Sequence, residues 1–374
     1  MRRAVGILVI SLSVTAFAAE PETYSWNLPK GFPTPLVPAD NPMSAAKVEL
    51  GRFLFYDTRM SVNGKSSCAN CHQQKLAFTD GRAASLGATG QSHSRSAMSL
   101  VNVAYAAALT WSNPQLKKLE DQALVPMLGD HPVELGLREG DGFLPMLRSE
   151  AKYKQLFDRA FPGDRDPFTI ANVTKAIACF ERSIVSARSP YDRYHYYRDD
   201  AAVSDSAKRG EVLFFNQHLS CFRCHGGFDF SDATVSDRNP DRRIEFHNTG
   251  LYNVSGPLNF PAPNLGIYEY TKVPSDIGKF KTPTLRNIVV TAPYMHDGSA
   301  PTLEAVLDHY SVGGRSIQDG PNRGAGHDNP NKDPLIGGFT LSRQDRVDLI
   351  AFLQSLTDEE LLHDQRFANP WPDK

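Results

Sequence analysis

The stretch Cys-Ala-Asn-Cys-His at residues 68–72 returns in the same pattern as Cys-Phe-Arg-Cys-His at residues 221–225, and the two together use four of the five cysteines. Two thiols three residues apart can form thioether bonds with the two vinyl groups of one haem, and the histidine that follows can then bind the iron. The sequence therefore predicts two covalently bound c-type haems. The first would be held by Cys68, Cys71 and His72, and the second by Cys221, Cys224 and His225.

This recurrence is too specific to follow from composition. Five cysteines and eleven histidines in 374 residues would give about 0.002 matches to Cys-x-x-Cys-His by chance, so two matches indicate a function. The alternatives are a redox-active cysteine pair and a four-cysteine zinc site. Neither needs a histidine directly after both pairs, and haem attachment is therefore the preferred interpretation.

Length and composition describe an ordinary globular protein. A chain of 374 residues is long enough for two or three domains, and 41% hydrophobic with 22% charged residues supplies ample core. The formal net charge is -2, so no broad basic field predicts binding to nucleic acid or to a membrane surface.

Residues 1–19 have the pattern of a cleaved secretory signal peptide. Arg2 and Arg3 precede an apolar run from Ala4 to Ala18, which closes on Ala-Phe-Ala at residues 16–18. A membrane anchor is disfavoured because the run is short and is interrupted by hydroxyl residues, and no later segment is long and apolar enough to span a bilayer. We therefore expect the mature chain in the periplasm of a Gram-negative bacterium, a compartment suited to haem attachment.

An internal repeat precedes each haem motif. Gly51-x-x-Leu54-Phe55-Tyr56 in the first half corresponds to Gly210-x-x-Leu213-Phe214-Phe215 in the second. In both copies a serine that could cap a helix, Ser44 or Ser204, comes before the pattern. The repeat predicts two haem domains, one over residues 20–200 and one over residues 201–374.

The remaining periodic segments are helical, which predicts an all-α protein. Helices are expected over residues 116–128, 143–161 and 169–186. A capping box at Ser342 and Asp345 should open a helix with Val347, Ile350, Leu353 and Leu356 on its buried stripe, closing the second haem pocket. Residues 226–300 should form long ordered loops on the second haem, and residues 191–197 an exposed corner between the domains.

Further strings add a family resemblance. They are LEDQALVP at residues 119–126, PVELG at 132–136, PTLRN at 283–287 and APYMHDG at 292–298. With the two haem motifs, they resemble the bacterial di-haem cytochrome c peroxidases and the related MauG enzymes over essentially the whole mature chain. TWSNP at 110–114 and AVLDHY at 305–310 are most similar to MbnH, a MauG-like enzyme of methanobactin gene clusters. The resemblance implies two cytochrome c-like haem domains with long loops.

In this family the distal ligand of the second haem corresponds to Tyr310, fourteen residues after His296. Plain peroxidases carry methionine at this position. A thioether stabilises ferrous iron, whereas a phenolate stabilises higher oxidation states, so the resemblance implies a second haem that holds oxidising equivalents, as in MauG. Met295 and His309 are the alternative ligands, in which case Tyr310 would be an ordinary helix aromatic.

The first haem would be the peroxide site. Glu134 corresponds to the glutamate that moves the peroxide proton in the family, with Gln122 and Pro126 lining the same pocket. The alternative for Glu134 is a solvated loop carboxylate, but its place in a Pro-Val-Glu-Leu-Gly turn rather than in a charge run favours catalysis. His131 is nearby and is expected behind the pocket or at the surface.

Trp111 matches the tryptophan that lies between the two haems in the family. An indole can carry a hole briefly and so divide one long electron transfer into two short ones. Core packing is the alternative.

Two features match the family pattern less closely. Plain peroxidases have a histidine that blocks the peroxide iron at rest, and the only histidine in that region is His93, in QSHSRS at 91–96, to which no ligand role can be assigned. The first haem would then be open without prior reduction.

The family also binds calcium through backbone carbonyls that match Thr291 and Pro293, while its asparagine ligand falls near Ser96. The basic residues Arg286, Lys279 and Lys281 could pair with haem propionates or be solvated.

Taken together, the resemblance implies a periplasmic di-haem enzyme that uses hydrogen peroxide to form a high-valent, bis-Fe(IV)-type state and oxidatively modifies a partner protein. For an MbnH-like chain the change is tryptophan to kynurenine in an MbnP-like copper protein. Surface aromatics of this chain, such as Trp371 or Tyr294, would be the points at which the oxidising equivalents leave it. A peroxide-scavenging peroxidase fed by a small redox protein is one alternative. A non-catalytic electron-transfer cytochrome is another, but it needs neither Glu134 nor Gln122.

Overall fold

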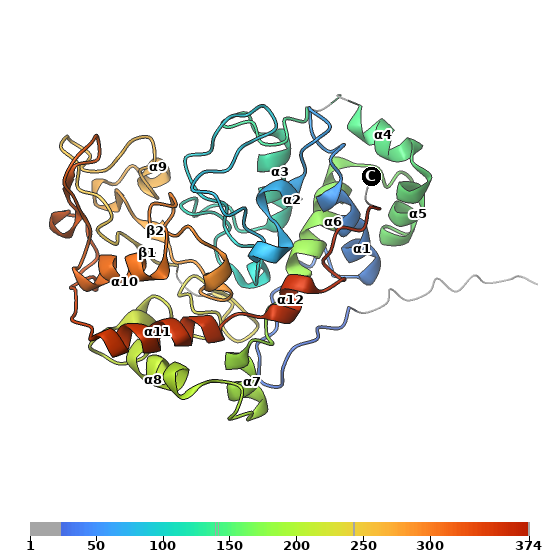
Figure 1. The fold of residues 1–374 in the computed structure, drawn as a ribbon. Helices are drawn as coiled ribbons and strands as arrows, with labels where there is room; N and C mark the ends of the chain where they lie inside the picture. The colour runs from blue at the N-terminus through green and yellow to red at the C-terminus, as the bar shows by residue number, and fades with distance from the viewer. Residues whose placement is uncertain (1–23, 139, 141, 242–243, 373–374) are drawn as a thin grey trace, which may run out of the picture.

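A computed structural model describes residues 24–138, 140, 142–241 and 244–372, so the expected signal peptide at residues 1–19 lies outside the described residues. The described chain is helical with two short antiparallel strand pairs, which confirms the all-α prediction (Figure 1). The α-helices are α1 (Ala45–Tyr56), α2 (Cys68–Cys71), α3 (Leu119–Leu128), α4 (Phe143–Ser149), α5 (Ala151–Ala160), α6 (Ile170–Ser183), α7 (Pro190–Tyr197), α8 (Asp205–Phe214), α9 (Tyr268–Thr271), α10 (Leu303–Ser311), α11 (Arg343–Ser355) and α12 (Glu359–His363). The strands are β1 (Phe246–His247), β2 (Phe280–Lys281), β3 (Ser316–Ile317) and β4 (Gly324–Ala325), paired β1 with β2 and β3 with β4.

The internal repeat is a repeated helix crossing. A Cβ atom on Gly51 of α1 would lie 1.9 Å from the carbonyl oxygen of Ala176 in α6, and one on Gly210 of α8 would lie 1.9 Å from that of Asp348 in α11. Only glycine lets the two helix backbones approach this closely. The α1–α6 and α8–α11 pairs therefore form the frame of the two halves (Figure 1).

Serine side chains begin the helices where the sequence predicts them. The Ser44 hydroxyl accepts a hydrogen bond from the backbone N–H of Lys47 at 3.2 Å, and Ser204 accepts one from Ala207 at 3.1 Å. At α11 the capping box is complete, because Ser342 and Asp345 each accept from the backbone N–H of the other, at 3.1 and 2.9 Å. These bonds satisfy amide groups that a helix leaves unpaired at its N-terminus.

Several predicted boundaries are wrong. The helix expected from residue 116 begins at Leu119, because the carbonyl of Leu116 instead accepts from the backbone N–H of Leu109 at 3.0 Å. The helix expected over 143–161 is divided at Glu150, which is extended and whose carboxylate accepts from Arg59 at 3.1 Å. The third, expected over 169–186, spans 170–183, with Thr169 as its cap.

The buried stripe expected on α11 is also partly wrong. Val347 is 51% exposed, whereas Leu349 and Phe352 are buried with Leu353. The close approach at Gly210 presses Asp348 and Phe352 against α8 and so turns Val347 outward. A stripe read from spacing alone cannot detect this rotation.

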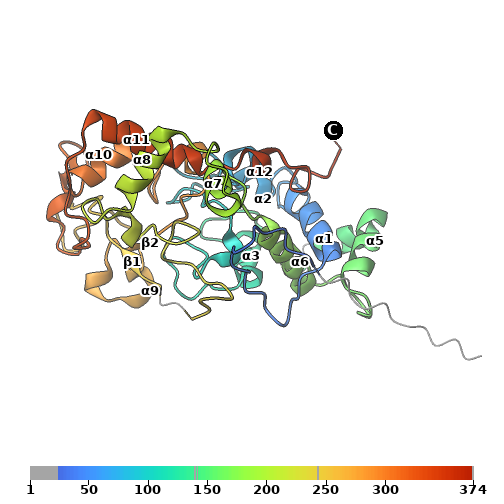
Figure 2. The same cartoon turned by 90° about the horizontal axis from the view of Figure 1, so that it is seen from below.

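The apolar core is divided between the two halves. One cluster lies among α1, α3, α5 and α6, and another among α8, α10 and α11. After α11 the chain returns to the first half, where Leu361 and Leu362 of α12 pack with Phe55 and Phe180 (Figures 1 and 2). The C-terminal segment therefore ties the two halves together.

A buried ion pair holds the connection between the halves. Arg286 donates to both carboxylate oxygens of Asp192 in α7, at 2.8 and 2.9 Å, and both side chains are fully buried. Burial by itself lowers the pKa of Arg286, but the Asp192 carboxylate more than reverses this and raises it. The segment expected as an exposed corner is therefore anchored through Asp192, although Tyr197 is exposed.

No helix in the described part of the chain combines the length and the apolar character that a membrane span requires.

Candidate active site

The two motif histidines have the same surroundings. Nδ1 of His72 lies 2.8 Å from the carbonyl oxygen of Phe78, and Nδ1 of His225 lies 3.0 Å from that of Phe230. A carbonyl on Nδ1 fixes the tautomer and leaves Nε2 free to bind a metal. Burial lowers the pKa of both histidines, which favours the neutral form that binds iron.

The same turn makes both carbonyls available. Phe78 and Phe230 are completely buried and both have positive φ, 61° and 50°. This conformation is uncommon for a bulky residue, so its recurrence indicates a constraint shared by the two sites. A phenylalanine five or six residues after each motif histidine was the signal in the sequence that could have identified it.

The cysteines fit haem attachment better than the two alternatives. Burial raises the pKa of Cys71 to about 11 and that of Cys221 to about 12, whereas a redox-active thiol needs a lowered pKa. Within the described residues, the group that could hold a metal through three side chains is Cys224, Asp232 and His247, which includes no second cysteine. A four-cysteine zinc site is therefore not formed.

Glu134 lies beside the first motif. Burial raises the pKa values of Cys68 and Cys71 and lowers that of His72. The negative charge of the Glu134 carboxylate adds a smaller effect that raises all three pKa values. Its side chain is 25% exposed. The Glu134 turn rests on the end of α3, since the backbone N–H of Leu135 donates to the carbonyl of Pro126 at 2.9 Å.

Gln122 and Pro126 are both half-buried residues of α3. Because they are four residues apart, they lie on the same side of that helix. His131 does not join this group, as its side chain is 92% exposed and its nearest charged partner is Asp130.

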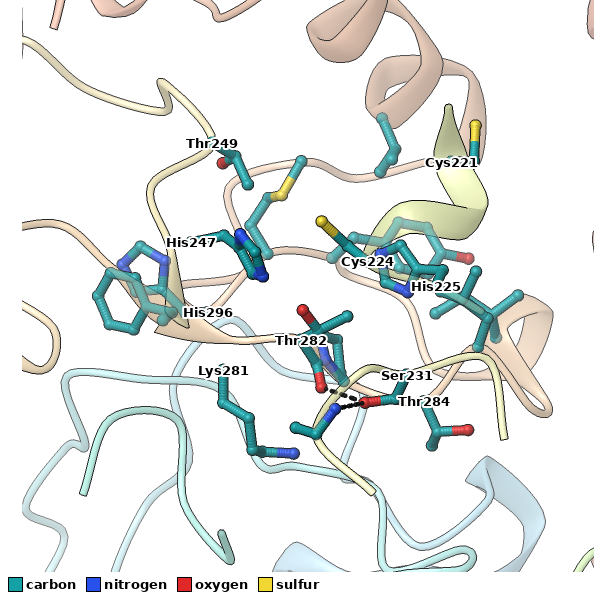
Figure 3. Close-up of a pocket in the computed structure, with 18 of the residues that line it drawn as sticks. Cys221, Cys224, His225, Ser231, His247, Thr249, Lys281, Thr282, Thr284 and His296 are labelled. Atoms are coloured by element: carbon teal, nitrogen blue, oxygen red, sulfur yellow. Dashed lines mark hydrogen bonds between the residues drawn. The ribbon is translucent and has the colours of Figure 1, made fainter. Parts of the chain in front are cut away.

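The second motif opens into a cavity of about 640 Å³. Its lining includes Cys221, Cys224 and His225, with His296 on the opposite side (Figure 3). Residues 96–103 of the first half also line it, so the cavity extends toward the first motif. This arrangement of two thiols, a free imidazole nitrogen and a large cavity fits a covalently bound haem.

Helix α10 turns one face toward this cavity. Leu303, Val306, Leu307 and Tyr310 line it, at the spacing of one helix face. Burial raises the pKa of Tyr310, and Cys224 and Cys221 add smaller charge effects, so its phenol lies close to the second motif. Met295 lines the same cavity, whereas His309 is outside the lining. Of the three predicted ligands, Tyr310 and Met295 are therefore the two that line this site.

Trp111 lies between the two halves. Its indole N–H donates to the carbonyl of Ser96 at 2.9 Å, and its own carbonyl accepts from the backbone N–H of Lys281 at 2.8 Å. Ser96 in turn donates its backbone N–H to the carbonyl of His296 at 2.9 Å. Trp111 also lines the cavity, so it joins the first-half loop to the distal wall of the second site.

Basic residues of the second site differ in their availability. Lys281 lines the cavity, and burial lowers its pKa to about 8 (Figure 3). Lys279 instead forms an ion pair with Asp276 at 3.2 Å, and Arg286 forms one with Asp192. Of the three predicted propionate partners, Lys281 is the one whose ammonium group remains free of an ion pair among the described residues.

His247 was missed from the sequence. It lines the cavity, with Nε2 2.8 Å from Asp232 and Nδ1 2.5 Å from Asp333. Burial alone would lower its pKa, but the two carboxylates raise it to about 12, so the ring is cationic. Its partners lie 15 and 86 residues away, and no local pattern could have identified the group.

The remaining predicted residues have less distinctive places. Thr291 and Pro293 line the cavity, and the Thr291 hydroxyl donates to the carbonyl of Ile288 at 3.0 Å. Tyr294, expected as a surface aromatic, is only 9% exposed, because it packs in the core of the second half. Trp371 is half-buried and donates its indole N–H to the carbonyl of Phe53 at 3.0 Å.

Comparisons with known proteins agree with two haem sites. Residues 45–201 match the family described as di-haem cytochrome c peroxidase, and residues 279–311 match one described as RoxA-like, cytochrome c-like. Cytochrome-c peroxidase IdrP1 of Pseudomonas sp. (strain SCT) is 35% identical over 96% of this chain and 93% of its own length. The methylamine utilization protein MauG of Methylophilus methylotrophus is 34% identical over 94% of both chains.

Solved structures show the same likeness. The crystal structure of a MauG-like protein associated with microbial copper homeostasis is 44% identical, with a TM-score of 0.90, over 93% of this chain and all of that one. The di-haem peroxidase BthA of Burkholderia thailandensis E264 shares the fold, with a TM-score of 0.66 at 21% identity over 86% of this chain and 88% of its own. With two cysteine pairs and two imidazoles arranged for haem, this chain is a di-haem oxidoreductase that belongs to the family of MauG and the di-haem cytochrome c peroxidases.

Proposed function

We propose that the chain uses hydrogen peroxide to store two oxidising equivalents and then oxidises a partner protein with them. The observation that carries this proposal is the order of three side chains: Glu134 beside the first motif, Trp111 between the halves and Tyr310 beside the second motif. A plain electron carrier needs no carboxylate beside its first haem.

Each of these side chains has a distinct task in the proposal. The bound haems supply the redox chemistry with peroxide. Glu134 accepts a proton from the peroxide oxygen nearer the iron and returns it to the leaving oxygen, with Gln122 and Pro126 shaping the pocket. Trp111 passes an electron between the halves. Tyr310 would hold the second haem iron through its phenolate oxygen, a ligand that favours oxidised iron.

The proposed partner is an MbnP-like periplasmic copper protein, in which a tryptophan becomes kynurenine. Support comes from the 44% identical structural relative, which is described as associated with microbial copper homeostasis. Electron transfer over a distance means that the substrate tryptophan need not enter either haem pocket. We also propose that the chain is exported by residues 1–19 and that residues 20–200 and 201–374 carry the first and second haem, respectively.

Peroxide scavenging is the second candidate function. It is favoured by the 35% identity to IdrP1, which is named a cytochrome-c peroxidase. A scavenger would use Met295 rather than Tyr310 on the second iron and would draw electrons from a small redox protein. Both side chains line the cavity, so the ligand must be identified spectroscopically.

Calcium binding at the carbonyls of Thr291 and Pro293 remains part of the proposal. Carbonyl oxygens suit this hard cation. Metal analysis of the purified protein before and after chelation tests it, and a calcium content below one ion per chain would reject it.

Mass spectrometry of a co-expressed partner tests the proposed function. The partner should gain the mass of a tryptophan-to-kynurenine conversion when it is incubated with this protein and peroxide, and should stay unmodified without peroxide. The Glu134→Gln variant should modify it on the order of 10²-fold more slowly. An unmodified partner together with rapid peroxide consumption fed by a reduced cytochrome would support the scavenger instead.

A further inference from the structure

His93, to which the sequence assigns no role, ends a tightly closed loop. The backbone N–H of His93 donates to the carbonyl of Ser85 at 2.9 Å, and that of Gly87 donates to Gln91 at 2.9 Å. Leu86 and Ser92 form an antiparallel bridge between these two bonds. The loop from Ser85 to His93 is therefore held by its own backbone, which fixes where the His93 side chain begins.

This loop is bonded directly to the turn that carries Glu134. The backbone N–H of Ala88 donates to the carbonyl of Glu134 at 2.6 Å, and that of Val133 donates to the side-chain oxygen of Gln91 at 2.8 Å. A Cβ atom on Gly87 would lie 1.8 Å from the carbonyl oxygen of Val133, so the two backbones are in direct contact. The position of His93 relative to Glu134 is thus set by several independent contacts.

The other end of the loop lies at the first haem motif. Burial raises the pKa of Cys71, and the nearby side chain of Ser85 opposes this rise. Ser85 is only 3% exposed. One short loop therefore extends from a haem-attaching cysteine to the proposed proton-transfer group.

The side chains of His93 and Glu134 meet. Nε2 of His93 lies 3.0 Å from Oε1 of Glu134, and the two side chains are 28% and 25% exposed. Among the described residues, His93 is the basic side chain that lies within ion-pair distance of Glu134. The contact uses one ring nitrogen and one carboxylate oxygen, and the second carboxylate oxygen is left for chemistry.

We infer that His93 is a positioning residue that holds the Glu134 carboxylate for proton transfer, and that it is not a ligand of the first iron. This inference rests on the proposed role of Glu134. Nε2 of His93 contacts the carboxylate at 3.0 Å and is therefore not available to a metal, and the backbone bonds of the loop oppose a swing of the other ring nitrogen toward one. Small displacements of a catalytic group are costly, so holding the carboxylate matters for rate.

The two roles for His93 predict opposite results in the ferric haem-loaded protein. If His93 positions Glu134, His93→Ala leaves the electron paramagnetic resonance signal of the first haem unchanged and slows the reaction with peroxide about tenfold to a hundredfold. His93→Gln, whose amide can still donate to the carboxylate, recovers part of that rate. If His93 binds the iron, His93→Ala converts a low-spin signal to high-spin and speeds the reaction, and the inference is overturned.

A double-mutant cycle separates this inference from the proposed function. With Glu134→Gln in place, adding His93→Ala should cause little further slowing, because the positioned group is already absent. Independent, additive losses would reject the positioning role while leaving Glu134 in the reaction. A Glu134→Gln variant with an unchanged rate would reject the proposed proton transfer itself and the inference with it.

The matched control is His131→Ala. His131 lies three residues from Glu134 in sequence but its side chain is 92% exposed. Both the resonance signal and the peroxide rate should stay as in the unchanged protein. Haem content and the thermal midpoint of each variant show whether a slow rate reflects misfolding, and a His93→Ala protein that is slow only because it has lost haem would overturn the inference.

Discussion

Tyr310 is the residue that we propose determines which chemistry the second site favours. Its phenol faces the cavity from the C-terminal end of α10. Burial raises the pKa of this phenol when no metal is bound. An iron must therefore displace the phenolic proton when it binds. Replacing this oxygen with a thioether should favour ferrous iron.

Tyr310→Met should therefore raise the reduction potential of the second haem by on the order of 0.1 V or more and shorten the lifetime of the peroxide product. Spectroelectrochemical titration and stopped-flow absorbance measure the two effects. Met295→Leu is the matched control, since Met295 lines the same cavity. If Met295→Leu shifts the potential and Tyr310→Met does not, methionine is the ligand.

Glu181 of α6 is an acid whose burial makes stability depend on pH. It is 5% exposed, and Oε2 has no hydrogen-bond partner. Burial raises its pKa from 4.5 to about 8, although neighbouring Arg182 opposes the shift. Between these two pH values the folded protein therefore holds a proton that the unfolded chain has released.

Over this window the unfolding free energy should fall as pH rises, by up to about 1.4 kcal/mol per pH unit from this group. Glu181→Gln carries no titrating proton, so it should become progressively more stable than the unchanged protein from pH 5 to pH 8. Denaturant unfolding at several pH values measures this difference. The exposed Glu359→Gln is the control, and parallel pH slopes for Glu181→Gln and the unchanged protein would refute the prediction.

At the scale of helices, the repeated glycine is the feature that organises both halves. The sequence showed that Gly51 and Gly210 occupy equivalent positions, but the reason for glycine lies in the partner helices, more than 100 residues away in each case. An added methyl group would meet a backbone carbonyl, which cannot rotate aside as a side chain can.

Gly210→Ala should destabilise the second half by about 1–3 kcal/mol despite the better helix propensity of alanine. Chemical denaturation followed by circular dichroism gives the value. Val212→Ala in the same helix is the control, because Val212 is 70% exposed and its loss should change stability little. Equal stability of Gly210→Ala and the unchanged protein would mean that the helices can separate at no cost.

Local chemistry explains what could be predicted from sequence. Haem attachment depends on five consecutive residues, and helix starts depend on a serine and the next three residues, so CANCH, CFRCH, Ser44 and Ser342 were sufficient. The contacts of His93 with Glu134 and of His247 with Asp232 and Asp333 are tertiary. Such contacts leave no periodic pattern in the sequence. The rotation of α11 that exposes Val347 also results from a tertiary contact, the close approach of α8 and α11.

At the scale of the whole molecule, Trp111 connects the two haem-binding halves. Its indole is bonded to Ser96 of the first half and its backbone to Lys281 of the second, so it is held in place from both sides. Residues 96–103 and the second motif line one cavity, which therefore reaches from the second site to the first half.

Trp111→Phe should leave the first reaction with peroxide unchanged and slow the later spectral change of the second haem. Phenylalanine preserves the apolar packing but is harder to oxidise and lacks the N–H that bonds Ser96. Stopped-flow spectra at the two Soret maxima separate the steps. If both haems respond at the original rate, electrons pass between the halves by another route.

The most direct test of the whole account is to add one equivalent of hydrogen peroxide to the all-ferric protein, without reductant, and to follow both haem spectra. The account predicts that both haems change promptly, that the product persists alone and that it decays when the partner protein is added. Absence of any change until the protein is first reduced, or rapid return to the ferric spectrum with continued peroxide consumption, would contradict it.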